Sequence, residues 1–196
     1  MERWTGRVAV VTGASSGIGA AIAVALVKHG LKVVGLARRV ERIQELTKSL
    51  KSTKGELHAL KCDVSKEKEI KEAFQWVKKR FGGVDILVNN AAVMFDSSLI
   101  DGDNDEMKTM VDLNITGLNM CTKEALKSMK ERGVDDGHII NLNSILGHAV
   151  LFDGFCVYTA TKHAVTALTE GLRRELVKQK SKIRITVSMT SYALTN

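Results

Sequence analysis

The chain alternates strictly between short apolar segments of strand length and longer segments with helical periodicity. The expected strands are Arg7–Thr12, Lys32–Ala37, Glu56–Cys62, Val84–Asn90, Gly137–Ser144 and Arg184–Ser188. The expected helices are Gly17–His29, Arg39–Lys51, Ser65–Phe81, Asp103–Arg132 and Phe155–Gln179. This alternation requires parallel strands joined by right-handed crossovers, with helices on both faces of the sheet. We therefore predict an α/β fold, a doubly wound, Rossmann-like parallel sheet with six readable strands.

The helical segments carry residues that commonly start and stop helices. Ser65 precedes its helix and is expected to be the N-cap. Gly30 and Gly82 follow two of the helices and are expected to end them. The chain has 196 residues and shows no linker, repeat or low-complexity stretch. We expect a single domain over residues 1–196, because this length supports one hydrophobic core.

Charge and composition limit the possible partners. The formal net charge is +7, with 44% hydrophobic and 26% charged residues. The stretch KEKEIKE, residues 66–72, mixes both signs at helical spacing, which is typical of a solvated helix face. No basic stripe with interleaved aromatic residues is visible, so we do not expect a nucleic-acid partner. A basic balance also suits an anionic cofactor.

The cysteines and apolar runs indicate the compartment. Cys62, Cys121 and Cys156 are far apart and form no CxxC pair, so neither a disulfide nor a metal site is expected. The run Ala20–Val27 is too short to span a bilayer, and the N-terminus is a poor signal peptide. We expect a cytoplasmic protein with no membrane span.

The first strand runs directly into TGASSGIG, residues 12–19, which opens a helix. Gly13 is expected to permit the tight turn, Gly17 to let backbone approach a phosphate, and Gly19 to let the helix pack closely. The helix N-terminus offers free N–H groups and a positive dipole end to a pyrophosphate. Glycines alone are weak evidence, but the strand–turn–helix context favours a dinucleotide over a plain turn.

The end of the second strand bears on the choice of cofactor. An NAD site usually has an acidic residue about 20 residues past the glycines, which binds the ribose 2′-hydroxyl. Here the sequence is ARRVER, with Arg38 and Arg39 at the strand end. Guanidinium groups suit a 2′-phosphate, so NADP(H) is favoured over NAD(H).

The stretch VYTATK places Tyr158 and Lys162 four residues apart, on one helical face. A free tyrosine has a pKa near 10 and is a poor acid or base at neutral pH. A nearby ammonium group stabilises the phenolate, which would bring the phenol closer to the working range of an acid–base catalyst. A Y-x-x-x-K pair alone is common on protein surfaces, so the context decides.

The context is an ordered set of motifs. After the glycine loop come NNAA at residues 89–92, Asn114 inside a helix, Ser144 at the end of the fifth strand, and the pair Tyr158 and Lys162. The carboxyl ends of parallel strands share one edge, where ligands bind. From Arg7 to Ser188 this set resembles the classical short-chain dehydrogenase/reductase family. Two stretches, residues 1–23 and 158–176, look most like its insect farnesol dehydrogenase-type members.

The resemblance implies a catalytic tetrad. Tyr158 would exchange the proton of the substrate carbonyl or alcohol, and Lys162 would lower its pKa and hold the nicotinamide ribose. Ser144 would hydrogen-bond the substrate oxygen. Asn114 would hold a water that links Lys162 to solvent. The implied cofactor-binding residues are Gly13, Ser15, Ser16, Gly17, Ile18, Gly19, Arg38, Arg39, Asp63, Val64, Asn90, Tyr158 and Lys162.

Three further expectations concern aspartates and asparagines. For Asp63, a contact to adenine and a plain turn role are evenly balanced. Asn89 would steady the central sheet, and Asp85 is expected to be a turn residue. The resemblance also implies a homodimer or homotetramer built on the two long helices, Asp103–Arg132 and Phe155–Gln179.

The sequence departs from the family pattern in two places. Ala92 stands where the family usually has glycine. After the sixth strand the family typically continues with a Pro-Gly pair, a substrate loop and a seventh strand, whereas this chain reads MTSYALTN. We expect a chain that is truncated relative to the family and lacks the seventh strand.

Two functions therefore stay open. The first is an NADP-dependent oxidoreductase that interconverts an alcohol and a carbonyl, on farnesol or a similar isoprenoid or small alcohol. The alternative is a truncated form that binds NADP with little or no catalytic activity.

Overall fold

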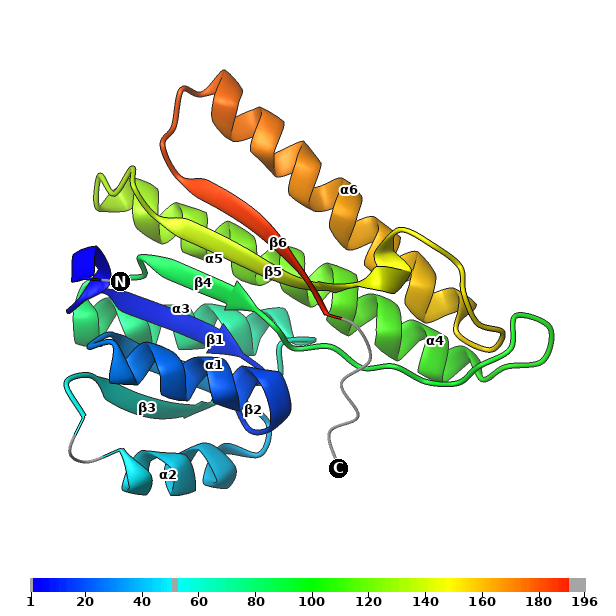
Figure 1. Ribbon diagram of the computed structural model, residues 1–196, viewed down its shortest axis with the longest axis horizontal. Coiled ribbons are helices and arrows are strands. Elements are labelled where there is room, and N and C mark those ends of the chain that lie inside the picture. Colours follow the sequence, from blue (N-terminus) through cyan, green and yellow to red (C-terminus); the bar gives the residue numbers. More distant parts are fainter. Residues whose placement is uncertain (1, 51–52, 191–196) are drawn as a thin grey trace.

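The computed structural model describes residues 2–50 and 53–190 and contains one six-stranded sheet (Figure 1). The strands are β1 (Val8–Thr12), β2 (Lys32–Ala37), β3 (Glu56–Lys61), β4 (Ile86–Asn89), β5 (His138–Ser144) and β6 (Arg184–Thr190). The helices are α1 (Gly17–Lys28), α2 (Val40–Ser49), α3 (Glu67–Phe81), α4 (Asn104–Val111), α5 (Leu118–Glu131) and α6 (Cys156–Lys178). Short 3-10 helices are η1 (Glu2–Trp4) and η3 (Ile145–Gly147), and η2 (Asp112–Gly117) is π-helical.

The strand order is β3-β2-β1-β4-β5-β6, and every neighbouring pair is parallel. The chain moves outward from β1 in one direction, then returns and moves outward in the other. The strand order therefore reverses between β1 and β4, and ligands of such sheets bind at the carboxyl ends of the strands beside this reversal. The prediction of a doubly wound α/β fold is confirmed. The last six residues of the stretch MTSYALTN lie outside the described residues.

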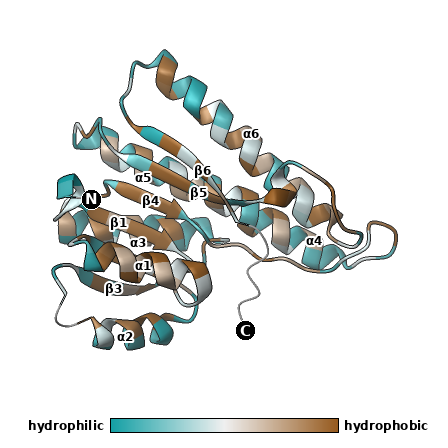
Figure 2. Cartoon of the chain, in the orientation of Figure 1, coloured by the Kyte–Doolittle hydropathy of each residue, from teal (hydrophilic) through white to brown (hydrophobic). Residues whose placement is uncertain are grey.

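Alternate side chains along the strands build two hydrophobic layers. Val8, Val10, Val34 and Leu36 pack with buried residues of α3 and α5 on one face. Ala9, Val11, Val33 and Ala37 pack with α1 and α2 on the other. Figure 2 shows the central strands as largely hydrophobic and the helices as mixed. Burial on both faces explains why these strands are continuously apolar in the sequence.

Most predicted elements begin and end within two residues of the observed ones, but two details are wrong. Ser65 is not the N-cap of α3; that position is Lys66, which makes no side-chain capping bond. The Ser65 N–H and hydroxyl both donate to Asp63 Oδ1, at 3.0 and 2.8 Å. Ser65 therefore closes a local turn of the kind that Asp and Ser side chains commonly stabilise.

The second error is the single helix Asp103–Arg132. The structure divides it into α4, the π-helical η2 and α5. Asn114 lies in η2, with its side chain bonded outside its own helix. Such π-helical insertions are rare and often mark functional sites.

Asp85 lies in the bend before β4, as predicted, and it is in addition a buried structural anion, which the prediction missed. It is 2% exposed and lies between the guanidinium groups of Arg7 and Arg132, at 3.3 and 3.2 Å. Its second oxygen accepts a hydrogen bond from the Val8 N–H at 2.8 Å. The carboxylate therefore ties the start of β1 to the start of β4 and to the end of α5.

Among the described residues, none of the helices is long and apolar enough to cross a membrane. Likewise, no group of three or more His, Cys, Asp or Glu side chains in residues 2–50 and 53–190 is placed to hold a metal ion.

Candidate cofactor pocket and active site

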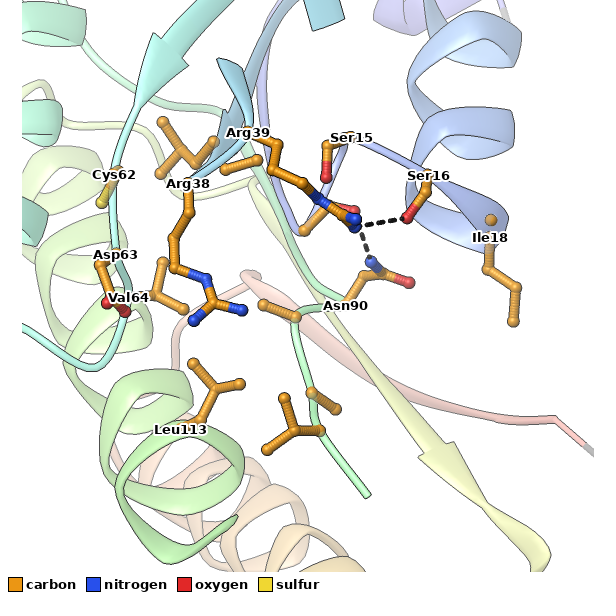
Figure 3. A pocket seen from close by; sticks show the side chains of 17 residues that line it. Ser15, Ser16, Ile18, Arg38, Arg39, Cys62, Asp63, Val64, Asn90 and Leu113 are labelled. Atoms are coloured by element: carbon orange, nitrogen blue, oxygen red, sulfur yellow. Dashed lines mark hydrogen bonds between the residues drawn. The ribbon is translucent and has the colours of Figure 1, made fainter. Parts of the chain in front are cut away.

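A pocket of about 310 Å³ lies at the carboxyl ends of the strands, beside the reversal of strand order (Figure 3). Its walls come from the loop after β1, the ends of β2 and β3, the segment after β4, and η2. The lining residues are Gly13, Ser15, Ser16, Gly17, Ile18, Leu36, Ala37, Arg38, Arg39, Cys62, Asp63, Val64, Asn90, Ala91, Ala92, Val93 and Leu113.

The glycine loop has a backbone that requires glycine at two positions. Gly13 and Gly17 have φ of +68° and +55°, a region that L-residues rarely adopt. Gly19 has a different role. A β-carbon there would collide with the carbonyl oxygen of Gly13 and the side-chain amide of Asn90. Gly19 therefore allows α1 to close on its own loop and on the end of β4.

Thr12 and Asn90 hold this loop in place. Asn90 Nδ2 donates to the carbonyl oxygens of Thr12 and Gly13, at 2.9 and 3.3 Å. The Thr12 hydroxyl accepts from the N–H groups of Asn90 and Ala91, both at 3.0 Å. Thr12 was not predicted as a site residue. Its position between the first strand and the glycine loop could have indicated a role. Its hydroxyl contacts could not be predicted, because they depend on β1 and β4 being neighbours in the sheet.

Arg38 and Arg39 stand at the end of β2, on the exposed side of the pocket. Figure 3 shows Arg39 directed toward Ser16, whose hydroxyl lies 3.4 Å from the guanidinium group. The two cations and the N-terminus of α1 thus share one pocket. Neither arginine is among the residues that form carboxylate ion pairs in the described part of the chain.

Asp63 and Cys62 form the wall at the end of β3. Partial burial opposes ionisation of Asp63, but hydrogen bonds from Ser65 and the charge of Arg38 outweigh it and hold the pKa of Asp63 below its usual value. Asp63 thus both closes a turn and lines the pocket. Burial raises the pKa of Cys62 to about 12, so this thiol stays neutral at physiological pH.

These features fit an anionic dinucleotide. The glycine loop exposes the N-terminus of α1 to the pocket, where a pyrophosphate would bind, and Arg38 and Arg39 add two cations to the pocket wall. Ala92 causes no backbone strain. Lys180 is the one non-glycine residue with positive φ among the described residues, so Ala92 does not adopt the left-handed conformation that favours glycine. The departure from glycine at this position is therefore compatible with the fold.

Asn114 braces the far wall of the pocket. Its Oδ1 accepts from the Val93 N–H and its Nδ2 donates to the Val93 carbonyl, both at 2.9 Å. Nδ2 also donates to the Thr161 hydroxyl at 3.1 Å. Gly117 brings the same helical segment against the Val64 carbonyl, where a β-carbon would collide. The side-chain amide of Asn114 therefore links the main chain of Val93 to the side chain of Thr161 on α6.

Lys162 is buried on α6, with 5% of its surface exposed. Its Nζ donates to the Leu142 carbonyl at 3.0 Å and lies 5.6 Å from the centre of the Tyr158 ring. Burial lowers the pKa of Lys162 to about 8. At neutral pH it is still mostly an ammonium ion, held close to the phenol ring.

Ser144 ends β5 and begins η3, where its hydroxyl accepts from the Leu146 N–H at 3.2 Å. The segment η3 packs against α6, as does η2. The four predicted tetrad residues are thus carried by segments that meet around the first turns of α6.

The structure gathers ten of the predicted cofactor residues around one pocket, but not three others. Gly19 lies beneath the loop, and Tyr158 and Lys162 lie on α6, outside the residues that line this pocket. Asn89 is buried, and its Nδ2 donates to Thr122 and Asn141, both at 2.9 Å. It joins β4 to β5 and α5, as expected for a residue that steadies the central sheet.

The fold and pocket are those of a dinucleotide-binding α/β protein, and comparison with known proteins gives the family. The family described as short chain dehydrogenase matches residues 7–196. Farnesol dehydrogenase from Aedes aegypti is 54% identical over 189 residues, which span 95% of this chain and 77% of that protein. The chain therefore belongs to the short-chain dehydrogenase/reductase family of oxidoreductases, which bind nicotinamide cofactors.

Solved structures of the family agree with the fold. A metagenomic short-chain oxidoreductase in complex with NADP matches with a TM-score of 0.88 at 30% identity, covering 96% of this chain and 84% of that one. A short-chain dehydrogenase/reductase from Burkholderia phymatum in complex with NAD matches with a TM-score of 0.92 at 25% identity, covering 98% and 68%. Structures of this fold thus hold either dinucleotide.

Proposed function

We propose that the protein is an NADP(H)-dependent oxidoreductase that interconverts an alcohol and a carbonyl. The observation that carries the proposal is that two features lie together. A pocket suited to a dinucleotide, with Arg38 and Arg39 in its wall, is bordered by η2, and η2 and η3 both pack against α6. These three segments hold or adjoin Asn114, Ser144, Tyr158 and Lys162. NADP(H), when bound, would supply the hydride chemistry.

The residues of this chain would handle the proton and the substrate oxygen. Tyr158 would give a proton to the carbonyl oxygen during reduction and take it back during oxidation. The ammonium group of Lys162 would stabilise the phenolate form of Tyr158, because the two groups are neighbours in a site of low dielectric. The Ser144 hydroxyl would hydrogen-bond the same substrate oxygen and stabilise the charge that develops on it.

The cofactor would lie along the pocket. The loop residues Gly13, Ser15, Ser16, Gly17 and Ile18 would face the pyrophosphate, since backbone N–H groups at a helix N-terminus bind anions. Arg38 and Arg39 would bind the 2′-phosphate of NADP(H), and Asp63 and Val64 would contact the adenine. Gly19 and Asn90 would shape the loop, and Tyr158 and Lys162 would hold the nicotinamide ribose.

A farnesol-like or other apolar alcohol is the proposed substrate. The Aedes aegypti relative is named farnesol dehydrogenase. In addition, the segments after β4 and η3, which the Ser97–Gly154 hydrogen bond joins, expose large apolar side chains: Met94, Leu99, Ile100, Val150, Leu151 and Phe152. Such a rim suits a substrate with a long hydrocarbon part.

The test follows NADPH absorbance on the purified 196-residue chain with farnesal and with small aldehydes, beside Tyr158→Phe. We expect turnover by the wild type and a loss of about a hundredfold or more in Tyr158→Phe. Equal rates in both would remove the role of Tyr158. Tight NADPH binding without turnover would instead favour the alternative, a cofactor-binding protein with little activity.

We also propose a homodimer or homotetramer in the cytoplasm. A groove of about 450 Å³ between α5 and α6 is lined by Leu118, Leu126, Leu168 and Leu172, which a second copy would cover. Cys62, Cys121 and Cys156 are free thiols, which suits a reducing compartment. Light scattering at several concentrations tests the assembly, and a mass of one chain throughout would contradict it.

A further inference from the structure

The hydroxyl group of Thr161 joins two hydrogen bonds that connect the cofactor pocket to the helix of Tyr158. It accepts from Asn114 Nδ2 at 3.1 Å and donates to the Tyr158 carbonyl at 2.7 Å. Thr161 is 1% exposed. Because a hydroxyl has one hydrogen to donate and lone pairs to accept, both bonds form together and fix its rotation.

The Asn114 amide on the other side of this bond has only one workable orientation. Its oxygen accepts from the Val93 N–H, and its nitrogen donates one hydrogen to the Val93 carbonyl and the other to Thr161. Val93 in turn lines the cofactor pocket. A continuous path therefore runs from the pocket wall through Asn114 and Thr161 to the main chain of Tyr158.

We propose that Thr161 is a positioning residue, which sets where the pocket wall at Val93 stands relative to Tyr158. This proposal rests on the proposed function, because it assigns the two ends of the path to cofactor and proton transfer. Thr161 itself does not line the pocket. Its effect passes through the orientation of Asn114 and through the first turn of α6, so a small displacement there would separate the reacting groups.

The competing explanation is that Thr161 only satisfies buried polar groups, as many helical threonines do. The chain offers a matched control for this. Thr169 lies on the same helix, is 8% exposed, accepts from Asn141 Nδ2 at 2.9 Å and donates to the Val165 carbonyl at 2.7 Å. Its bonds have the same chemistry, but they lead to β5 and not to the pocket.

The experiment compares Thr161→Val, Thr161→Ser and Thr169→Val. Both valine variants remove a hydroxyl from a similar buried pair, so we expect similar losses of stability in chemical denaturation. Only Thr161→Val should lower kcat by about tenfold or more and weaken NADPH binding several-fold. Thr161→Ser keeps the hydroxyl and should return both values to within about threefold of wild type. If the Thr161→Val variant does not fold, Thr161→Ala takes its place in the comparison.

Amide hydrogen exchange gives a readout that does not depend on turnover. Thr161→Val should accelerate exchange at the Val93 amide, and Thr169→Val should not. If wild type shows no alcohol turnover, the proposed function fails, while the exchange data and the NADPH affinity still test the link. Unchanged exchange at Val93, or equal loss of kcat in both valine variants, would overturn the proposal.

Discussion

The side-chain amide of Asn90 occupies the position that a β-carbon on Gly19 would need. The carbonyl oxygen of Gly13 crowds the same place, so the collision would involve backbone as well as a side chain. The glycine loop, the first turn of α1 and the end of β4 therefore fit together only when residue 19 has no side chain.

Gly19→Ala should damage the cofactor pocket and the fold together. The added methyl must push α1 away from the loop, so we expect unfolding to become easier by about 1–3 kcal/mol. NADPH affinity should fall by about tenfold or more, because the N–H groups of the loop lose their alignment. Urea denaturation and cofactor titration measure the two effects.

Gly171→Ala is the control for this change. Gly171 is also helical, but a β-carbon there meets nothing within 4 Å in the described part of the chain. Alanine should raise helix stability by about 0.5–1 kcal/mol and leave NADPH affinity unchanged. Equal behaviour of the two variants would show that the crowding at Gly19 has no consequence.

Arg38 and Arg39 should decide between the two dinucleotides. Replacing either by alanine removes a cation that would bind the 2′-phosphate, and charge-assisted hydrogen bonds contribute about 1.5–3 kcal/mol. We expect the Kd for NADPH to rise by about tenfold or more, with the Kd for NADH almost unchanged. Isothermal titration with both cofactors measures this. Arg42→Ala, an exposed cation on α2 outside the pocket, should change neither.

The buried ammonium group of Lys162 should make stability depend on pH. Its pKa is about 8 in the folded chain, against 10.5 for a free lysine. Below pH 8 the group is charged in both states, so the cost of burying the charge is fully present. Between pH 8 and 10.5 the folded chain loses the proton first, so stability should rise relative to a chain without this group, by about 3 kcal/mol in total.

Lys162→Met removes this titration. The difference in unfolding free energy between wild type and Lys162→Met, measured at several pH values, should shift in favour of wild type as the pH rises from 8 to 10. Comparing the two chains cancels the opposite effect of the buried thiols Cys62 and Cys121, whose raised pKa values lower stability above pH 9. A constant difference would contradict the burial of a charged lysine.

Asp85→Asn should be destabilising. The carboxylate is buried, accepts from the Val8 N–H and pairs with both arginines, whereas Arg7 and Arg132 are each 30% exposed, so we expect a loss of about 1–3 kcal/mol. Asp136 also pairs with Arg7, at 2.6 Å, but it is 63% exposed. Asp136→Asn should therefore cost less than about 1 kcal/mol. Thermal and urea denaturation compare the two, and equal losses would contradict the buried role of Asp85.

The fold could be predicted from the sequence because apolar strands and helical periodicity repeat along the whole chain. The strand Lys32–Ala37, for example, is apolar on both faces and was predicted with its observed ends. The glycine loop was readable for a similar reason, since its residues are consecutive. Local patterns of this kind need no knowledge of distant neighbours.

Apart from Ser65, which bonds the nearby Asp63, the features missed from the sequence belong to residues whose partners are far away along the chain. Asn114 lies in the π-helical η2, and its amide binds Val93, 21 residues before it, and Thr161, 47 residues after it. Asp85 is held by Arg7 and Arg132, which lie 78 residues before it and 47 after it by their numbers. No periodicity in the sequence marks such pairs, because they form only when the fold brings distant segments side by side.

A hydrogen bond at Gly154 joins the segment after β4 to the segment after η3. The Gly154 carbonyl accepts this bond from the Ser97 N–H at 2.8 Å, and Gly154 lies just before Phe155, the N-cap of α6. Its φ is +75°, and the carboxylate of Asp96 stands where a β-carbon would be. Gly154→Ala should therefore strain the backbone and displace the carboxylate of Asp96, which is the end of an exposed side chain.

Gly133→Ala is the control for the backbone strain. Gly133 has φ of +66°, but a β-carbon there would meet nothing within 4 Å among the described residues. Both variants should lose about 1 kcal/mol of stability from strain, because the exposed Asp96 side chain can rotate away from the methyl group of Gly154→Ala. Only Gly154→Ala should raise the KM for a long-chain alcohol, because the segments around Ser97 and Phe155 would separate. An unchanged KM in both variants would show that the Ser97–Gly154 contact does not shape the substrate site.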